Sequence, residues 1–316
     1  MTIAVVMATR DRPALLRRCL DALAAQERRP DELILTDDAS VEPVSDIVAA
    51  YRDRLPIRLV RNEQPGGPGR ARQRGWQLAT SDYVAFTDDD CRPTPAWLSS
   101  FAAEASPDRI LVGKTMPDPD DGPFESVFDR SMRIESHDGR FSTCNVLYPR
   151  ALLETVGGFD ARFDIYGEDT DLGQRVLAAG AEGVWVPDAL VWHAVHRRSW
   201  DEALRERTRV GEIARLVSRH PGLKRSIWEG PFWKPQHRRM LLAIAGVAAI
   251  PLTPFTAIAA IPWLRAAPKQ VRYTVPSGRN KGVVWLIGQV AGLAGIDAVE
   301  LASCVAGSAR HRTVFL

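Results

Sequence analysis

Short apolar runs alternate with segments of helical periodicity over residues 1–90. Residues 3–8 form a continuous apolar run and predict a buried parallel β-strand. Further strands are predicted at residues 32–36, 57–60 and 82–87. The segments between them place their apolar residues on one helical face and predict helices: residues 13–23, 44–51 and 70–79. This alternation predicts an α/β fold, a mostly parallel sheet with flanking helices.

The pattern loosens after about residue 115. A polar, turn-rich loop over residues 116–123 precedes a mixture of strand and helix signals. Strands are expected at 140–150 and at 185–196, the latter as one or two short pieces, and helices at 151–158, 167–180 and 200–219.

The last third of the chain contains two long apolar stretches. Residues 240–264 carry no charged side chain over 25 positions, although three prolines interrupt them. Their length suits a membrane-spanning helix of about 20 residues, but the prolines favour a kinked hairpin or an interfacial helix. Residues 283–309 include Asp297 and Glu300, which favour an interfacial or protein-packed helix over a lipid-facing span. A soluble helical subdomain packed on the rest of the chain is the alternative.

Charge is unevenly distributed along the chain. The whole sequence holds 41 Lys and Arg against 39 Asp and Glu, a formal net charge of +2. Residues 217–316 hold 13 basic and 3 acidic residues, a net charge of +10, which leaves −8 for residues 1–216. A basic C-terminal part indicates an anionic partner, either a membrane surface or a nucleic acid. The apolar stretches favour the membrane, and no nucleic-acid partner is expected.

The cysteines and the N-terminus indicate the compartment. Four scattered cysteines without CxxC spacing argue against a zinc or disulfide framework and fit a reducing environment. The first apolar run is too short for a signal peptide, and Arg10 interrupts it. We therefore expect the protein on the cytoplasmic side of the membrane.

Three polar clusters follow predicted strands: Thr9-Arg10-Asp11, Asp37-Asp38 and Asp88-Asp89-Asp90. Because parallel sheets bind ligands at the carboxyl ends of their strands, we expect these clusters on one rim. Three adjacent carboxylates are either screened by water on an exposed turn or hold a cation. On an extended backbone Asp88 and Asp90 lie on the same side, where they can hold Mg²⁺ or Mn²⁺ with room for diphosphate oxygens.

The second cluster and the loop after the third strand each have two interpretations. Asp37 and Asp38 either cap the next helix or accept from a nucleobase N–H or a ribose hydroxyl. The glycines and arginines of residues 65–75 form either a flexible turn or a close approach to a nucleotide, with Arg72 near its phosphates or base.

The same holds for two features later in the chain. Glu168, Asp169 and Asp171 stand at a helix start, where negative charge is favoured in any case. They also follow an apolar and aromatic loop, residues 157–167, that could form the wall of a pocket. His193 follows an apolar run and is either a structural histidine or a metal ligand.

Together these motifs resemble the family-2 glycosyltransferases, nucleotide-sugar enzymes of the GT-A (Rossmann-like) fold. The matching segments run in the family's order from residue 3 to about 195: VVMATRDRP, TDDAS, GGPGRARQRG, FTDDDCRP, NVLYPRALLETVGGFDARF and GEDTDLGQR, followed by His193. The chain departs from the family at Gln73, where many members have Asn after Arg72. We expect that change to alter base or ribose contacts only slightly.

The resemblance implies a role for each matching residue. Asp169 resembles the catalytic base, with Glu168 beside it. Asp88 and Asp90 resemble the D-x-D pair that binds the metal and the diphosphate, and His193 matches a position that adds a metal ligand in some members. The residues implied in nucleotide-sugar binding are Thr9, Arg10, Asp37, Asp38, Arg72, Asp88 and Asp89.

The expected protein is an inverting glycosyltransferase of the hexosyltransferase type that uses Mg²⁺ or Mn²⁺. Its donor is a nucleotide-diphosphate sugar, and its acceptor a glycan or lipid-linked hydroxyl at the cytoplasmic face of the cell membrane. Residues 1–219 form the expected catalytic domain and residues 220–316 the membrane-associating helical region. The alternatives are an inactive membrane-bound nucleotide-sugar scaffold and a sugar nucleotidyltransferase, although ATRDRP lacks the glycine-rich signature of the latter.

Overall fold

The computed structural model of the protein describes residues 1–163, 166–223, 232–276 and 281–316. The chain forms two compact units. The first comprises Met1–Asp120 and Ser131–Ala194, and the second comprises Asp121–Arg130 and Val195–Leu316. The functional boundary expected between residues 219 and 220 stays a prediction.

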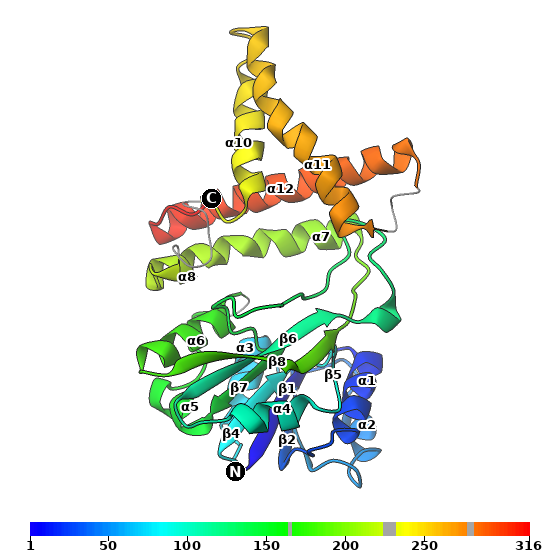
Figure 1. Ribbon diagram of the computed structural model, residues 1–316, viewed down its shortest axis with the longest axis vertical. Coiled ribbons are helices and arrows are strands. Elements are labelled where there is room, and N and C mark those ends of the chain that lie inside the picture. Colours follow the sequence, from blue (N-terminus) through cyan, green and yellow to red (C-terminus); the bar gives the residue numbers. More distant parts are fainter. Residues whose placement is uncertain (164–165, 224–231, 277–280) are drawn as a thin grey trace. The chain divides into compact units, whose positions relative to one another are not determined.

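The first unit is built on an eight-stranded sheet of order β3-β2-β1-β4-β7-β6-β8-β5 (Figure 1). Its strands are β1 (Ile3–Thr9), β2 (Glu32–Asp37), β3 (Ile57–Arg61), β4 (Tyr83–Thr87), β5 (Cys91–Pro93), β6 (Arg109–Pro117), β7 (Asn145–Pro149) and β8 (Glu182–His193). Strands β1 to β4 are parallel, β7 is antiparallel to β4 and β6, β8 is parallel to β6, and β5 is antiparallel to β8. The expected α/β fold with a mostly parallel sheet is confirmed.

Helices cover both faces of this sheet. They are α1 (Pro13–Ala24), α2 (Ser45–Ala49), α3 (Pro68–Trp76), α4 (Trp97–Glu104), α5 (Arg150–Val156) and α6 (Glu168–Ala178). Helices α1, α2 and α4 share one core with Ile3, Val5 and Met7, whereas α3, α5 and α6 pack on the opposite face with Ala4 and Val6. This division follows the two-residue period of a strand that is buried on both faces.

The sequence pattern was least informative between residues 88 and 120. It did not predict β5, α4 or β6. Later in the chain, it predicted one or two short strands where β8 has 12 residues. Strand β8 is long because it pairs with β6 on both sides of a register shift near Gly113, and its last three residues also pair with β5. Such a shift interrupts the apolar alternation that would otherwise identify the strand.

The second unit is helical. Its elements are α7 (Trp200–Arg207), the 3₁₀ helix η2 (Thr208–Glu212), α8 (Ile213–Arg219), α10 (Pro235–Ala248), the 3₁₀ helix η3 (Pro254–Ala260), α11 (Ile261–Thr274) and α12 (Val283–His311). The helix predicted over 200–219 is therefore divided by η2. Its start is fixed by a capping box in which Ser199 and Glu202 bond to each other's backbone amides.

Two chain segments far apart in sequence form the core of this unit. Val127, from the connection between β6 and β7, packs with residues of α10, α11 and α12. The Val127 amide donates to Gln289 Oε1 over 2.8 Å. Gly292 makes this approach close, since a Cβ there would lie 2.5 Å from the Phe128 ring. The connection at 121–130 is thus a structural part of the second unit.

Helix α12 is, within the described part of the chain, the one helix long and apolar enough to cross a membrane by length and composition. Its two acidic residues are nevertheless buried against protein. Asp297 accepts from Trp263 Nε1 over 2.9 Å, and Glu300 accepts from Lys234 Nζ over 2.7 Å. Burial alone would raise the pKa of Glu300, yet contacts with His237, Lys234 and Arg207 lower it to about 2. This side of α12 faces protein, as its acidic residues suggested.

Candidate active site

The three polar clusters lie after strands whose ends share one edge of the sheet. In the parallel pairing of β1 and β2, Thr9 stands opposite Asp37. Strand β4 pairs with β1 on the other side, with Phe86 opposite Val6, and leads directly into Asp88. The arrangement of the clusters along one rim therefore follows from the register of three neighbouring parallel strands.

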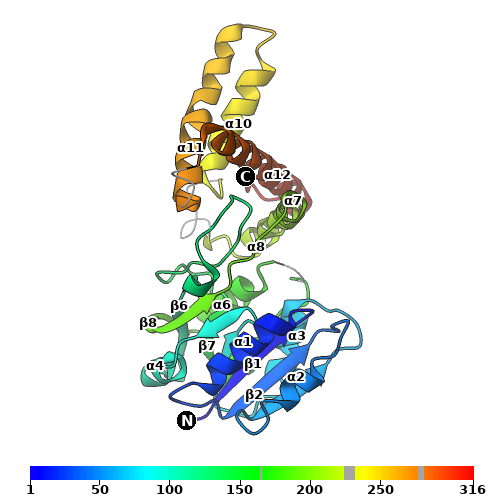
Figure 2. The ribbon, with the colours of Figure 1, turned by 90° about the vertical axis from the view of Figure 1, so that its right-hand side faces the viewer.

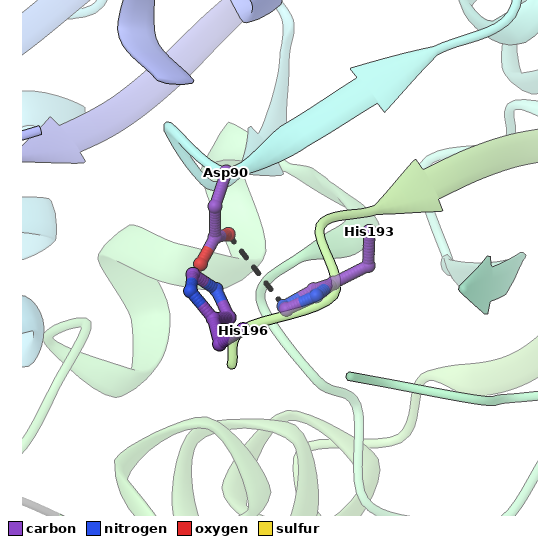
Figure 3. Close-up of side chains that lie close together, drawn as sticks. All are labelled: Asp90, His193 and His196. Atoms are coloured by element: carbon purple, nitrogen blue, oxygen red, sulfur yellow. Dashed lines mark ion pairs between the residues drawn. The ribbon is translucent and has the colours of Figure 1, made fainter. Parts of the chain in front are cut away.

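The pairing of β5 with β8 brings a histidine to the aspartates. Cys91 stands opposite His193, and His193 Nε2 lies 3.5 Å from Asp90 Oδ1 (Figure 3). The other ring nitrogen, Nδ1, is 2.9 Å from the carbonyl oxygen of Ala194, so it carries the proton in that hydrogen bond. In the neutral ring, Nε2 then presents a lone pair toward Asp90. His196, also drawn in Figure 3, belongs to the second unit.

Asp90 lies near two further candidate ligands for a divalent cation, Asp88 and His193. Carboxylate oxygens of Asp88 and Asp90 lie within 4.8 Å of each other and of the Cys91 sulfur. Burial raises the pKa of Cys91 well above its ordinary value, so the thiol stays protonated and is a poor ligand. Two carboxylates and an imidazole lone pair form a donor set that Mg²⁺ or Mn²⁺ accepts.

Two arginines balance this acidic group. Arg72 Nη2 donates to Asp88 Oδ1, and Arg12 Nη1 lies 2.9 Å from Asp90 Oδ2 and 3.2 Å from Asp89 Oδ1. Asp89 is only 3% exposed. Its burial raises its pKa to about 6, although Arg12 acts in the opposite direction. Water alone therefore does not screen these carboxylates, because the guanidinium groups of Arg12 and Arg72 form ion pairs with them and hold them in place.

Arg12 was missed from the sequence. It lies within the ATRDRP motif, directly before α1, and no role was predicted for it. The sequence did contain a signal for this role. Three adjacent carboxylates need nearby positive charge, and the end of the first strand, which lies beside them, carries arginines. Arg12 is therefore a candidate residue of the site.

Helix α6 supplies the acidic pair opposite this cluster. Glu168 Oε1 lies 3.3 Å from Arg72 Nη1, so one guanidinium joins Asp88 to Glu168. Asp169 accepts from the backbone amide of Thr170 over 2.7 Å. Asp171, the third acid of the motif, is buried and bonds Arg175 Nε over 2.8 Å. The three acids of the helix start therefore have different surroundings.

Asp169 is the carboxylate of this pair best suited to take up a proton. It is half-buried, and its burial and the neighbouring Glu168 raise its pKa to about 7. Burial also raises the pKa of Glu168, but the Arg72 guanidinium opposes this and favours the charged form. Because Glu168 is engaged by Arg72, Asp169 is the group whose proton affinity suits neutral pH.

Most of the residues expected to bind the nucleoside form hydrogen bonds or ion pairs with other residues at this edge of the sheet. Thr9 Oγ1 donates to Asp89 Oδ2 over 2.7 Å, and Asp37 accepts from the Ser40 amide over 2.9 Å and from Arg61 Nη1. Asp37 does not cap the next helix, because Val44 is the N-cap of α2. Arg10 is exposed and lies 3.4 Å from Asp11.

Asp38 organises the glycine loop. Its carboxylate accepts from the amides of Gly66 and Gly67, both over 2.9 Å, and from Asn62 Nδ2 over 2.7 Å. Gly67 has a φ of +82°, which a residue with a side chain adopts only at a cost, and directly precedes α3. The loop is therefore a turn fixed by hydrogen bonds to Asp38 rather than a flexible one. It positions α3 and, through it, Arg72.

Gln73 has a structural role that the sequence did not suggest. Its Oε1 accepts from Trp76 Nε1 and from the Phe159 amide, both over 2.7 Å, and its Nε2 donates to the Gly157 carbonyl over 3.2 Å. The neighbouring Gly158 has no room for a Cβ, which would lie 2.3 Å from Gln73 Oε1. Gln73 thus fixes the glycine turn at 157–158 against α3.

Gln73→Asn is expected to lower the free energy of unfolding by about 1–2 kcal/mol, because the shorter side chain cannot keep its bonds to both Trp76 and Phe159. Urea denaturation measures this difference. The matched control is Gln77→Asn, which changes an exposed residue at the end of the same helix and should shift stability by less than about 0.5 kcal/mol. Equal stability of the two variants would contradict the role of Gln73.

Comparison with known proteins identifies the fold. A mannosyltransferase from Pyrobaculum calidifontis, solved with GDP-Man and Mn²⁺, superposes with a TM-score of 0.58 and 19% identity over 98% of this chain and 86% of its own. Staphylococcus aureus TarS residues 1–349, solved with UDP-GlcNAc, gives a TM-score of 0.54 and 19% identity over 99% and 93%. These likenesses confirm the expected GT-A fold.

Sequence relatives carry transferase and synthase names. Validoxylamine A glucosyltransferase of Streptomyces hygroscopicus subsp. limoneus is 32% identical over 75% of this chain and 60% of its own length. The pre-mycofactocin glycosyltransferase of Mycobacterium tuberculosis is 31% identical over 69% and 48%, and the hyaluronan synthase of Pasteurella multocida is 27% identical over 60% and 24%. The chain thus spans between about a quarter and three fifths of these relatives. The model of the family described as Glycosyl transferase family 2 matches residues 4–166, more than half of the chain, and the chain therefore belongs to that family.

Proposed function

We propose that the protein transfers a sugar from a nucleotide-diphosphate sugar to an acceptor hydroxyl with inversion at the anomeric carbon. In enzyme terms it is an inverting hexosyltransferase that uses Mg²⁺ or Mn²⁺ and an aspartate base. The observation that carries the proposal is Asp169, a half-buried carboxylate with a pKa raised to about 7. Its neighbour Glu168 is joined through Arg72 to Asp88, one of a pair of aspartates suited to a cation.

The acceptor side of the reaction needs a proton acceptor. The attacking hydroxyl must lose its proton as the new bond forms, so a carboxylate must lie within hydrogen-bond reach of it. Asp169 takes that role, and Glu168 holds Arg72 beside it. Because attack opposite the leaving group inverts the anomeric centre, one base is sufficient and no covalent intermediate is required.

The donor side needs positive charge near the leaving diphosphate. Asp88, Asp90 and His193 would hold the divalent cation, which when bound offsets the charge that develops on the leaving oxygen. Arg72 and Arg12 already contact these aspartates and can turn to phosphate oxygens when the donor enters. Thr9, Arg10, Asp37 and Asp38 on the same rim would receive the nucleoside. The two solved neighbours are complexes with nucleotide sugars, one of them with Mn²⁺ as well, which supports this donor class.

We place the reaction at the cytoplasmic face of the cell membrane, with a lipid-linked or envelope glycan as acceptor. Residues 217–316 have a net charge of +10, which favours an anionic surface. The donor class is made in the cytoplasm, so the catalytic unit must face that side. The helical region from residue 220 would provide the attachment.

Donor identity is tested by thermal denaturation with a panel of UDP-, GDP- and TDP-sugars with and without Mn²⁺. A sugar nucleotide that binds the native state raises the melting temperature, and the rise should require the cation. A product assay with the radiolabelled donor then separates an enzyme from an inactive scaffold, which would bind without turnover. Release of pyrophosphate from a sugar phosphate and a nucleoside triphosphate would instead indicate a nucleotidyltransferase and contradict the proposal.

The pH profile reports the base. Asp169 must be deprotonated to accept the proton, and its pKa lies near 7, so kcat/KM should rise about tenfold per pH unit below pH 7 and level off above it. A carboxylate with an ordinary pKa near 4 would give a flat profile from pH 5 to 8. The measurement is kcat/KM from pH 5 to 9 at saturating Mn²⁺. A flat profile over that range contradicts Asp169 as the free-enzyme base.

A further inference from the structure

The outer surface of the α10–α11 pair is apolar where soluble proteins are polar. Figures 1 and 2 show the two helices side by side, extending away from α12 within the second unit. We define the hairpin tip as residues 240–264, which contain no charged side chain. Its large apolar residues are unusually exposed: Leu252 87%, Phe255 77%, Ile258 60%, Leu264 55%, Val247 54%, Leu242 48% and Ile244 48%.

Contact with a single protein groove would not account for this exposure. On α10, Met240, Ala243 and Gly246 are buried against the rest of the unit, while Leu242, Ile244 and Val247 face outward. The solvent-facing side of the helix is therefore as apolar as its packed side. A helix that is apolar all round is normally surrounded by protein core or by lipid. Lipid, unlike a groove, covers all outer sides of two helices at once.

Basic residues stand at the opposite end of the hairpin. Four exposed side chains form what we call the basic collar: Arg238, Arg265, Lys269 and Arg272. Gln236 Nε2 bonds Gln270 Oε1 over 2.6 Å, which places the start of α10 beside the middle of α11. The collar thus borders the tip on both helices. An apolar end followed by a ring of cations complements a bilayer with anionic headgroups.

The length of the tip matches one leaflet. Residues 240–248 of α10 rise about 13 Å, at about 1.5 Å per residue. The returning η3, with 7 residues, rises about 14 Å at about 2.0 Å per residue. Half of a hydrocarbon core of about 30 Å is about 15 Å. The tip is long enough to enter one leaflet and too short to cross both.

The backbone of the tip also suits a medium without water, in which each amide hydrogen needs a hydrogen-bond partner. Pro251, Pro254 and Pro262 have no amide hydrogen that would need a partner. At the turn, the amides of Leu252 and Thr253 donate to the carbonyl of Ala249 over 2.9 and 3.2 Å. Gly246 brings α10 against η3 so closely that a Cβ there would lie 2.4 Å from the Thr256 carbonyl. Small residues at such contacts are typical of helices packed in lipid.

We propose that the hairpin tip inserts into one leaflet of an anionic membrane, with the basic collar at the headgroups, as a monotopic anchor. Helix α12 then remains packed in protein, as its buried acids require. The proposal rests on the surface of the second unit and is independent of the catalytic residues.

Flotation with vesicles that contain neither donor nor acceptor tests the proposal. The full chain should bind phosphatidylcholine vesicles with about 30% phosphatidylglycerol, and Leu252→Asp with Phe255→Asp should weaken binding at least tenfold. Val41→Asp is the control for an added carboxylate, since it places an aspartate on an apolar residue that is 86% exposed in the first unit. It should bind as the unaltered protein does, and so should Asp169→Asn. Equal binding of the tip variant and the control would overturn the proposal.

The collar is tested by Arg265→Gln, Lys269→Gln and Arg272→Gln together. This variant should lose roughly a hundredfold of its affinity for the anionic vesicles. On phosphatidylcholine alone it should bind as the unaltered protein does. An equal loss on both vesicles would overturn the electrostatic part of the proposal.

Depth is measured with a fluorescent label. All four native cysteines are buried, so Leu252→Cys provides an exposed site for an environment-sensitive probe. Bromine on the lipid acyl chains should quench the bound probe, and aqueous iodide should not. Iodide quenching on vesicles would overturn insertion. Sedimentation showing a dimer that the two aspartates convert to a monomer, without vesicle binding, would assign the tip to a second copy of the chain.

Discussion

Asp169→Asn is expected to lower kcat by roughly 10²–10⁴ while leaving the affinity for the sugar nucleotide within about twofold. Asparagine keeps the shape of the side chain and its place beside Thr170, but it cannot accept the acceptor's proton. The residue lies at the start of α6, outside the Asp88–Arg72–Glu168 ion pairs, so the donor side should be preserved. Steady-state kinetics and calorimetric titration with the donor measure the two quantities separately.

Glu168→Gln is the matched control for this prediction. It removes the partner of Arg72 and should weaken donor binding more than it lowers the chemical step, because Arg72 also contacts Asp88. Loss of the fall in kcat/KM below pH 7 in Asp169→Asn would further identify the base. If Glu168→Gln loses the chemical step and Asp169→Asn does not, the base has been assigned to the wrong neighbour.

Asp90→Asn should abolish the divalent-dependent part of nucleotide binding, and Asp88→Asn should do the same. Each removes one carboxylate from a pair that the sheet holds together, and Asp90 also faces His193 at 3.5 Å. A loss of at least a hundredfold in donor affinity with Mn²⁺ is expected, while affinity without the metal should change little. Isothermal titration with and without EDTA distinguishes the two.

Two further variants serve as controls for this prediction. Asp53→Asn, an exposed aspartate in the loop before β3, should leave binding unchanged. Asp89→Asn should act mainly on stability, since its carboxylate is buried and bonded to Thr9 and Arg12. Unaltered turnover in Asp90→Asn would end the metal-site interpretation.

The sequence predicted those helices and strands whose formation depends on a pattern of neighbouring residues. The apolar runs identified β1, β2 and β4, whose residues are almost all buried, and the ends of β2 and β4 located the aspartates. Strand β3 was identified too, although its residues are half-buried or exposed. Strands β5 and β6 gave no such signal. Strand β5 has 3 residues and forms only by pairing with β8, about a hundred positions later, so no local pattern can reveal it.

The same limit applies to the site. Sequence motifs could name Asp88, Asp90 and Asp169 as candidates. They could not show that Gln73 and Asp38 hold turns, or that Arg12 joins Asp89 to Asp90. These roles depend on side-chain hydrogen bonds between elements that the chain brings together only on folding, and several residue types could supply each bond. The roles of the site residues in catalysis stay predictions until the variants above are measured.

The β6–β7 connection also has a consequence for the order in which the protein folds during its synthesis. Val127 finds its partner Gln289 only 162 residues later, on α12. At about 5–20 residues per second, the ribosome needs roughly 10–30 s to cover that distance. Throughout this interval the apolar residues Val127 and Phe128 have no α12 to pack against. The segment 121–130 is therefore the part of the nascent chain that we expect a chaperone to bind, and shortening the chain before α12 would leave it exposed permanently.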